Sequence, residues 1–316
     1  MRIDDGPRTT AVFCRRLSSV VMMFPAEISN DPNISLTLEV NNTMAVDRSV
    51  LEKKIEDSKK VVREAFGKYP QDRLAVTWTG GKDSTLTLWI IRQVCQQDGR
   101  PVPRCFCIDE GDMFPEIQEF LETHKRGWEI DLDLIHNGDV SRAAGGELGA
   151  RVRVTDLNAR NRAEIERLGY EEDEFEYEPE SYVGNHLMKT VPMNIYLEEN
   201  RIAAFFGGIR WDEQEARKAE TYVSPRPATE YSPAHDRINP ILHFSERDIW
   251  NTTFEFKIPY CSLYEQGYRS LGARITTVKA GDVPAWEQDL ENTMERGGRR
   301  QDKESLMEKM RSLGYM

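Results

Sequence analysis

Short apolar runs alternate along the chain with stretches in which apolar residues recur at helical spacing. The apolar runs of strand length begin at residue 74 and lie further on at 102–108, 129–135, 202–206 and 238–242. Helical spacing occupies 47–69, begins again at 86, and returns at 116–124 and 183–199. Strands that alternate with helices in this way predict an α/β fold, in which a doubly wound parallel sheet is covered by helices on both faces.

The pattern also divides the chain into three parts. Residues 1–45 lack periodicity and contain turn-like Asn and Pro residues, so we expect a peripheral arm there. Residues 46–245 carry the alternating strands and helices of the main domain. After a helix cap at Ser245, residues 246–316 predict a small C-terminal helical lobe and a tail, with an amphipathic stretch at 302–313.

The most distinctive segment joins the first strand to the next helix. Its sequence is Thr79-Gly80-Gly81-Lys82-Asp83-Ser84. A helix N-terminus collects free backbone N–H groups and positive dipole charge, and glycines let a phosphate approach them closely. Lys82 adds a point charge and Ser84 adds a hydroxyl donor. The segment therefore predicts an anion cradle, and the alternative is a plain strand-to-helix turn with a surface lysine.

Two further strand ends carry residues suited to a nucleotide. Asp109 follows the second apolar run in an acidic, glycine-bearing turn, so we expect it to accept a hydrogen bond from a ribose or an adenine amino group. The alternative for this residue is a helix cap. Gly208 follows a later run, and the guanidinium groups of Arg210 and Arg217 after it are expected to hold an anion from two sides. A salt-bridged surface helix is the alternative there.

Composition narrows the class of partner. The chain has 316 residues and a formal net charge of −12, which argues against a general nucleic-acid binder, because such a protein presents a basic face. No run of 18 or more apolar residues occurs, so we expect no membrane partner and a cytoplasmic location. The five cysteines are odd in number and lack paired metal-ligand spacing, so we expect no disulfide scaffold.

Several motifs in the same order resemble one superfamily. The segment at 79–84 resembles the PP-loop of the ATP pyrophosphatase superfamily, whose members cleave ATP between the α and β phosphates and release pyrophosphate. The other matching motifs are Ile108-Asp109-Glu110-Gly111, Phe114-Pro115-Glu116 and Gly207-Gly208-Ile209-Arg210-Trp211-Asp212-Glu213. Over 51–316 the chain is similar to the group of phosphoadenosine-phosphosulfate reductases and eukaryotic-type FAD synthetases. Within that group it most resembles sulfate adenylyltransferase subunit 2, the small subunit of ATP sulfurylase. The resemblance implies an adenine-nucleotide alpha-hydrolase (Rossmann-like) fold, with the PP-loop nucleotide-binding domain at 46–245.

The chain departs from that subunit at three places. Trp211 stands where a second arginine is usual, Gly80 stands where isoleucine is typical, and 262–272 looks more like the reductases and FAD synthetases. Reductases of this kind use a C-terminal nucleophilic cysteine, whereas no cysteine follows Cys261 in this sequence. Because a thiolate is the nucleophile in that chemistry, reduction is disfavoured and adenylyl transfer is expected.

The residues and the resemblance together predict an adenylyltransferase that uses ATP. The residues expected to bind this cofactor are Thr79, Gly80, Gly81, Lys82, Asp83, Ser84, Asp109 and Gly208. Mg²⁺ is the second expected cofactor, bridging phosphates with Asp83 as its protein ligand. Lys82, Arg210 and Arg217 are expected to be catalytic, because transfer of this kind needs positioning and charge neutralisation.

The acceptor follows from the resemblance alone. Sulfate, a small-molecule oxyanion, is favoured because of the likeness to the ATP sulfurylase subunit, which also implies a GTPase large subunit as partner. One alternative is an FMN adenylyltransferase, and another is a sulfonucleotide reductase-family protein that lacks the C-terminal cysteine. A third is a non-catalytic nucleotide-binding adaptor in sulfur transfer. Trp211 in place of the second arginine would then mark the loss of turnover. The sequence leaves a homo-oligomer open.

Overall fold

The computed structural model describes residues 47–295. All of them belong to the second of two compact units, Val46–Met316. The expected arm at 1–45 and the amphipathic stretch at 302–313 lie outside the described residues. Among the described helices, none combines the length and the apolar character that a bilayer span requires.

A six-stranded sheet organises this unit, with the strand order β3-β2-β1-β6-β8-β7. Its strands are β1 (Leu74–Thr77), β2 (Arg104–Ile108), β3 (Leu132–Ile135), β6 (Ala204–Phe206), β7 (Val223–Arg226) and β8 (His235–Ile238). The first four of the order and β8 run parallel, whereas β7 pairs antiparallel with β8 at the edge. The predicted α/β fold with a mostly parallel sheet is confirmed.

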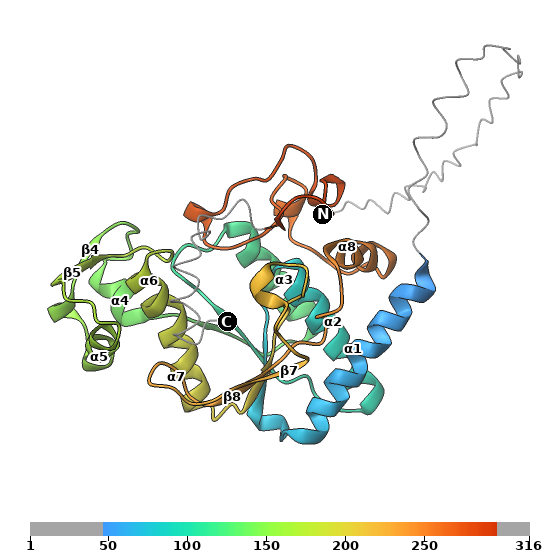
Figure 1. Ribbon diagram of the computed structural model, residues 1–316, viewed down its shortest axis with the longest axis horizontal. Helices are drawn as coiled ribbons and strands as arrows, with labels where there is room; N and C mark the ends of the chain where they lie inside the picture. Colours follow the sequence, from blue (N-terminus) through green and yellow to red (C-terminus); the bar gives the residue numbers. More distant parts are fainter. Residues whose placement is uncertain (1–46, 296–316) are drawn as a thin grey trace, which may run out of the picture. The chain divides into compact units, whose positions relative to one another are not determined.

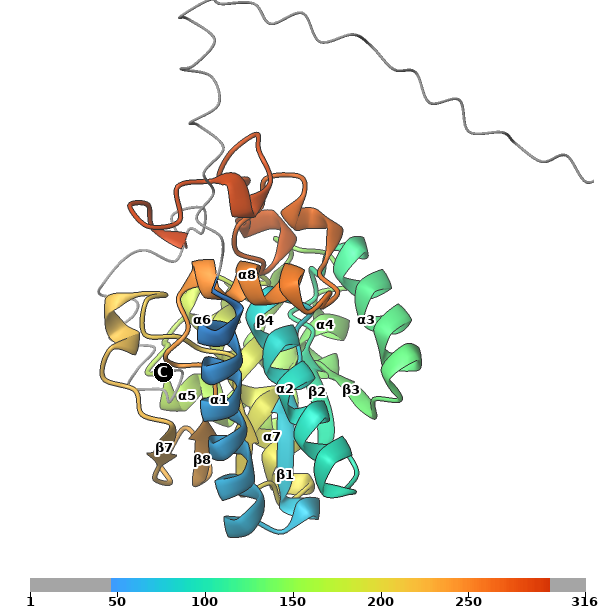
Figure 2. The same cartoon turned by 90° about the vertical axis from the view of Figure 1, so that its right-hand side faces the viewer.

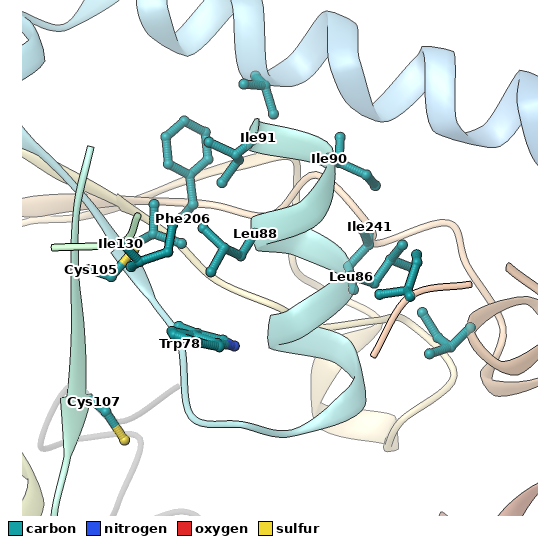
Figure 3. Close-up of a cluster of buried hydrophobic side chains, with 14 of the residues drawn as sticks. Trp78, Leu86, Leu88, Ile90, Ile91, Cys105, Cys107, Ile130, Phe206 and Ile241 are labelled. Atoms are coloured by element: carbon teal, nitrogen blue, oxygen red, sulfur yellow. The ribbon is translucent and has the colours of Figure 1, made fainter. Parts of the chain in front are cut away.

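Side chains of the central strands alternate between two apolar cores, as a sheet buried on both faces requires. One core takes Leu74, Val76, Cys105, Cys107, Ala204 and Phe206. The opposite core takes Ala75, Phe106 and Phe205, so the two cysteines of β2 face away from Phe106. Figure 3 shows the first core, where Leu88 and Ile91 lie beside Phe206.

Helices cover both faces of the sheet. The first core is closed by α1 (Arg48–Lys68), α2 (Lys82–Asp98), α3 (Pro115–Trp128) and α8 (Glu246–Glu255). Figure 2 shows α1 and α2 side by side on this face. The other face is covered by α7 (Val191–Glu199), through Met193, Tyr196 and Leu197. The sheet is therefore doubly wound.

Local signals start and stop these helices where the sequence predicts. Asp47 caps α1 by accepting the Ser49 N–H at 2.9 Å, and Pro70 follows its end. Ser245 and Asp248 form a reciprocal capping box at the start of α8. The predicted cap at Ser245 is confirmed.

An insertion between β3 and α7 has an apolar core of its own. It contains α4 (Gly138–Ala143), β4 (Arg151–Arg153), α5 (Ala159–Arg167), β5 (Glu174–Glu176) and α6 (Tyr182–Asn185). Its core includes Val140, Val152, Ile165, Phe175 and Leu187. Figure 1 shows these green elements gathered beside the sheet. The single helix expected at 183–199 is instead divided by a π-helical turn, His186–Thr190. Pro192, the second residue of α7, has no N–H to continue the regular ladder.

The last strands differ from the prediction. The prediction of a strand at 238–242 is wrong, because β8 ends at Ile238. The chain then turns, and the Asn239 side chain donates a hydrogen bond to the Thr221 carbonyl at 2.9 Å. Polar residues in His235–Ile238 hid the strand from a hydrophobicity pattern. The sequence reading also missed β7, in which Pro225 is tolerated because the strand lies at the sheet edge.

Residues 256–295 form turns rather than long helices, with short 3-10 turns at Ser262–Tyr264, Arg274–Thr276 and Ala285–Glu287. Their buried residues Cys261, Leu263, Tyr264, Ala285 and Leu290 join the same core as Trp250 of α8. The aromatic loop at 259–272 packs through Cys261, Leu263 and Tyr264 into this core. This part therefore lies directly on the face of the domain that carries α2 and α8.

Candidate functional site

The candidate site lies where the strand order reverses. From β1 the chain proceeds to β2 and β3 on one side, whereas β6 and β8 lie on the other side. In an open α/β sheet, the crevice outside the carboxyl ends of the strands at such a point is the usual ligand site. The PP-loop at 79–84 follows β1, and the glycine pair Gly207 and Gly208 follows β6.

The PP-loop turns sharply into α2. Gly80 has φ +76°, a left-handed conformation that favours glycine, and a Cβ there would lie 3.0 Å from Ile117 Cγ2. The Thr79 N–H donates to Ser84 Oγ at 3.2 Å, and Ser84 Oγ donates to the Gly81 carbonyl at 3.0 Å. The loop is thus held closed against the first turn of α2, whose N-terminus faces the crevice.

Gly208 allows the second loop to touch the first. A Cβ at Gly208 would lie 2.7 Å from the Ser84 nitrogen and 2.8 Å from the Asp83 carbonyl carbon. Both atoms belong to backbone in the first turn of α2, which cannot move aside cheaply. Any side chain larger than hydrogen at this position would therefore separate the two strand-end loops.

A hollow of about 200 Å³ opens at this contact. It is lined by Thr77, Thr79, Gly81, Lys82, Asp83, Ser84, Gly208, Ile209, Glu213, Tyr264, Ser270, Leu271 and Glu295. A neighbouring hollow of about 260 Å³ shares Thr79 and Leu271 with it and extends to Ile108 and Asp112 after β2. The two hollows adjoin at these shared residues and together make the crevice along the carboxyl edge of the sheet.

Lys82 and Arg210 lie beneath this crevice in a buried ionic cluster. Lys82 Nζ is 2.5 Å from Glu295 Oε1, 3.3 Å from an Asp83 oxygen and 3.7 Å from Glu246 Oε1. The guanidinium of Arg210 donates to Asp83 and to Glu295 Oε2, with only 1% of its surface exposed. One carboxylate, that of Glu295, therefore bridges the two cations.

Charge pairing outweighs burial at this cluster. Burial alone would lower the pKa of Lys82, but the carboxylates of Asp83 and Glu295 raise this pKa above its ordinary value. Burial alone would raise the pKa of Glu295, but Arg210 and Lys82 hold it well below its usual range. These side chains are therefore charged at neutral pH.

The sequence reading missed the site residues that the C-terminal part supplies. The Tyr264 hydroxyl accepts the backbone N–H of Lys82 at 2.8 Å, and Arg269 Nη2 lies 2.8 Å from Glu246 Oε2. The sequence did not indicate that the loop holding Tyr264 and Arg269 would contact the PP-loop. Glu295 lies 213 positions from Lys82 along the chain, so no local pattern could have indicated this pair.

The structure brings six predicted site residues to one hollow: Thr79, Gly81, Lys82, Asp83, Ser84 and Gly208. Asp109 instead lines a separate hollow of about 280 Å³ with His136 and Tyr177, and its Oδ1 accepts the Gly111 N–H at 2.9 Å. Arg217 lies in a 3-10 turn, 3.8 Å from Glu213 Oε2, and does not line the crevice described above.

A metal ion would find few protein ligands here. Within 47–295, no group of three or more His, Cys, Asp or Glu side chains is arranged to hold one. Asp83 is already paired with Arg210 and Lys82. It could offer Mg²⁺ one carboxylate at most, so phosphate oxygens and water would have to supply the other ligands.

The four cysteines of the described region lie in settings that disfavour the reactive thiolate. Cys95, Cys105, Cys107 and Cys261 are all buried and free. Burial raises the pKa of Cys95 and Cys261 to about 11 and that of Cys107 to about 12. Because the thiolate is the reactive form, these thiols are inert near neutral pH.

The mostly parallel sheet, with a crevice at its switch point and a glycine-bearing helix N-terminus beside it, defines a Rossmann-like α/β protein. A family model described as the phosphoadenosine phosphosulfate reductase domain matches residues 73–279. The chain belongs to this family, which is part of the PP-loop superfamily. The predicted recognition of that superfamily is confirmed.

Curated relatives carry two kinds of name. A probable FAD synthase of Caenorhabditis briggsae is 25% identical over 229 residues, covering 72% of this chain and 34% of the relative. A phosphoadenosine 5'-phosphosulfate reductase of Xanthomonas oryzae is 28% identical over 208 residues, covering 66% of this chain and 72% of the relative. The chain thus spans about a third of the length of the FAD synthase relative. These names give no support to a particular closeness to sulfate adenylyltransferase subunit 2.

A solved structure supports the fold. Candida glabrata FMN adenylyltransferase in complex with ATP is similar with a TM-score of 0.56 and 17% identity, over 81% of this chain and 89% of that one. At 17% identity, this similarity supports the architecture only.

Proposed function

We propose that this protein binds ATP in the switch-point crevice and transfers the adenylyl group to an anionic acceptor, releasing pyrophosphate. One observation carries the proposal: Gly208 lets two strand-end loops touch at the N-terminus of α2, beside a polar hollow. Backbone N–H groups, the helix dipole and the Ser84 hydroxyl suit phosphate oxygens there.

The transfer itself requires little covalent help from the protein. An acceptor oxygen forms a bond to the α-phosphorus, the bond from that phosphorus to the bridging oxygen breaks, and pyrophosphate leaves with the electron pair. The protein's part is to align the two groups and to neutralise charge. Mg²⁺ would supply further neutralisation between the phosphates, with Asp83 as a candidate ligand.

The nucleoside would lie along the crevice toward β2. Glu110 lines both the hollow that begins at Thr79 and the hollow that contains Asp109. This continuity supports a nucleoside position for Asp109, although its Oδ1 already accepts one backbone N–H. Arg210 would act on the anion only after release from its carboxylate partners, and Arg217 only after a movement of its 3-10 turn.

FMN is the acceptor we put first, because FAD synthases are among the relatives. Sulfate, the acceptor that the motifs first suggested, comes second. A GTPase partner is proposed only for the case in which sulfate is the acceptor. Thiol-based reduction ranks lower, because the cysteines at 95, 105, 107 and 261 are buried and protonated.

Pyrophosphate release from ATP and Mg²⁺ tests the proposal. The purified full chain is assayed with FMN, sulfate, molybdate or no acceptor, and the sulfate arm is repeated with a GTPase subunit of ATP sulfurylase. We expect release that depends on FMN, with FAD formed in equal amount. Pyrophosphate release with sulfate but not with FMN would make sulfate the acceptor in place of FMN. No release with any acceptor would overturn the proposal that the protein is an enzyme.

A further inference from the structure

We infer that the Glu295 carboxylate occupies the anion position of the PP-loop site and must leave when the pyrophosphate portion of a nucleotide binds. The inference rests on the proposed function, because it concerns the regulation of the same site. Glu295 lines the hollow that also contains Gly81, Ser84 and Gly208. It is therefore a group of the chain itself that lies where a ligand would bind.

The contacts of Glu295 resemble those of a bound oxyanion. One oxygen lies 2.5 Å from Lys82 Nζ, and the other accepts a hydrogen bond from the Arg210 guanidinium. Phosphate groups use the same lysine and guanidinium donors, through the same kind of charge-assisted hydrogen bond. While Glu295 stays, neither cation has its charge available for a phosphate.

The charge balance of the cluster indicates that one carboxylate is in excess. The cations are Lys82, Arg210 and Arg269, and the carboxylates in contact with them are Asp83, Asp212, Glu246 and Glu295. Four carboxylates thus contact three cations, and burial raises the pKa of Asp83 and of Glu246. A phosphate would compete with these carboxylates for the same cations, whereas departure of one carboxylate would free donors on Lys82 and Arg210 for it.

Glu295 is placed to depart more readily than Asp83 or Glu246. Asp83 lies in the first turn of α2, and Glu246 lies in the first turn of α8, where Arg269 Nε donates to it at 3.0 Å. Glu295 follows the turns after Leu290 and is the last residue that the structure describes. The preceding Met294 is 71% exposed, so at this point the chain runs on the surface and sends one side chain inward.

Pyrophosphate binding by the full chain provides the test. Isothermal titration with inorganic pyrophosphate compares the wild type with Glu295→Gln, which keeps the shape of the side chain and removes its charge. We expect the variant to bind pyrophosphate at least about tenfold more tightly, which corresponds to about 1.4 kcal/mol. Its thermal midpoint should fall, because two buried cations lose a partner.

Glu291→Gln is the matched control. Glu291 lies four positions earlier on the same segment, but it pairs with Arg247 at the surface, with 57% of its side chain exposed. We expect this variant to bind pyrophosphate as the wild type does. Glu295→Asp keeps the charge on a shorter side chain, so we expect its affinity for pyrophosphate to lie between those of the wild type and Glu295→Gln. This variant tests the inference if Glu295→Gln folds poorly.

The outcomes separate this inference from the proposed function. If the wild type binds pyrophosphate and both Glu295 variants bind no more tightly, Glu295 is a structural partner only and the inference is overturned while the anion site stands. If neither the wild type nor any variant binds pyrophosphate, the proposed function is overturned and the inference with it.

Discussion

The two glycine pairs of the site, Gly80-Gly81 after β1 and Gly207-Gly208 after β6, look alike in the sequence but serve different physical needs. Gly80 is required for its backbone conformation, since its φ is +76° and its nearest neighbour is a side-chain methyl of Ile117. Gly208 is required for space, since a Cβ would meet the backbone of Asp83 and Ser84 at less than 3 Å. A side chain can yield, whereas the first turn of a helix cannot.

The residues that follow the glycine pairs show a second contrast. Lys82 follows Gly81 directly, begins α2 and reaches Glu295, Asp83 and Glu246 with a single ammonium group. Arg210 comes two positions after Gly208 and divides the donors of one planar guanidinium among three carboxylates. Both side chains donate hydrogen bonds to the Glu295 carboxylate. The two loops are therefore joined twice, through backbone at Gly208 and through charge at Glu295.

The largest effect should come from Arg210→Ala, which leaves buried carboxylates without their cation. We expect the free energy of unfolding to fall by about 3–5 kcal/mol, the usual result of removing one partner from a buried ion pair. Urea denaturation measures it. Arg247→Ala is the control, because Arg247 pairs with Glu291 at the surface and should cost at most about 1 kcal/mol. Equal losses in the two variants would contradict the importance of the buried cluster.

Gly208→Ala should come next. The added methyl must push the second loop away from α2, so we expect a loss of about 2–3 kcal/mol in stability, typical of overpacking. Pyrophosphate binding should weaken with it, as titration would show. Gly127→Ala in α3 is the matched control, because a Cβ at Gly127 has no neighbour within 4 Å. Unchanged binding in Gly208→Ala would mean that the loop contact does not form the site.

Gly80→Ala should have the smallest effect of the three. The left-handed conformation costs a non-glycine residue about 1–2 kcal/mol, and the Ile117 methyl can move to admit a Cβ. Gly99 after α2 has φ +63° with open space around it, so Gly99→Ala isolates the cost of conformation. Denaturation of both variants should differ by only a few tenths of a kcal/mol. A cost for Gly80→Ala above that for Gly208→Ala would reverse the comparison of the two loops.

Much of the fold could be predicted because its signals are local. The apolar run from Leu74, the Asp47 cap and the capping box at Ser245 each determine an element within a few residues. The prediction failed where tertiary context decides. A polar strand such as β8 is stabilised by its pairing with β6, and an edge strand such as β7 by its pairing with β8, which no local pattern reveals.

For the candidate site, the sequence by itself determined the chemistry of the loop: glycines at a strand end, a helix N-terminus and hydroxyl donors at 79–84. Only the tertiary structure decided which charges meet. Lys82 and Arg210 were expected at the phosphates, and the fold instead directs both to Glu295, which arrives from the far end of the described chain. Backbone conformation follows from neighbours in sequence, whereas charge pairing follows from neighbours in space.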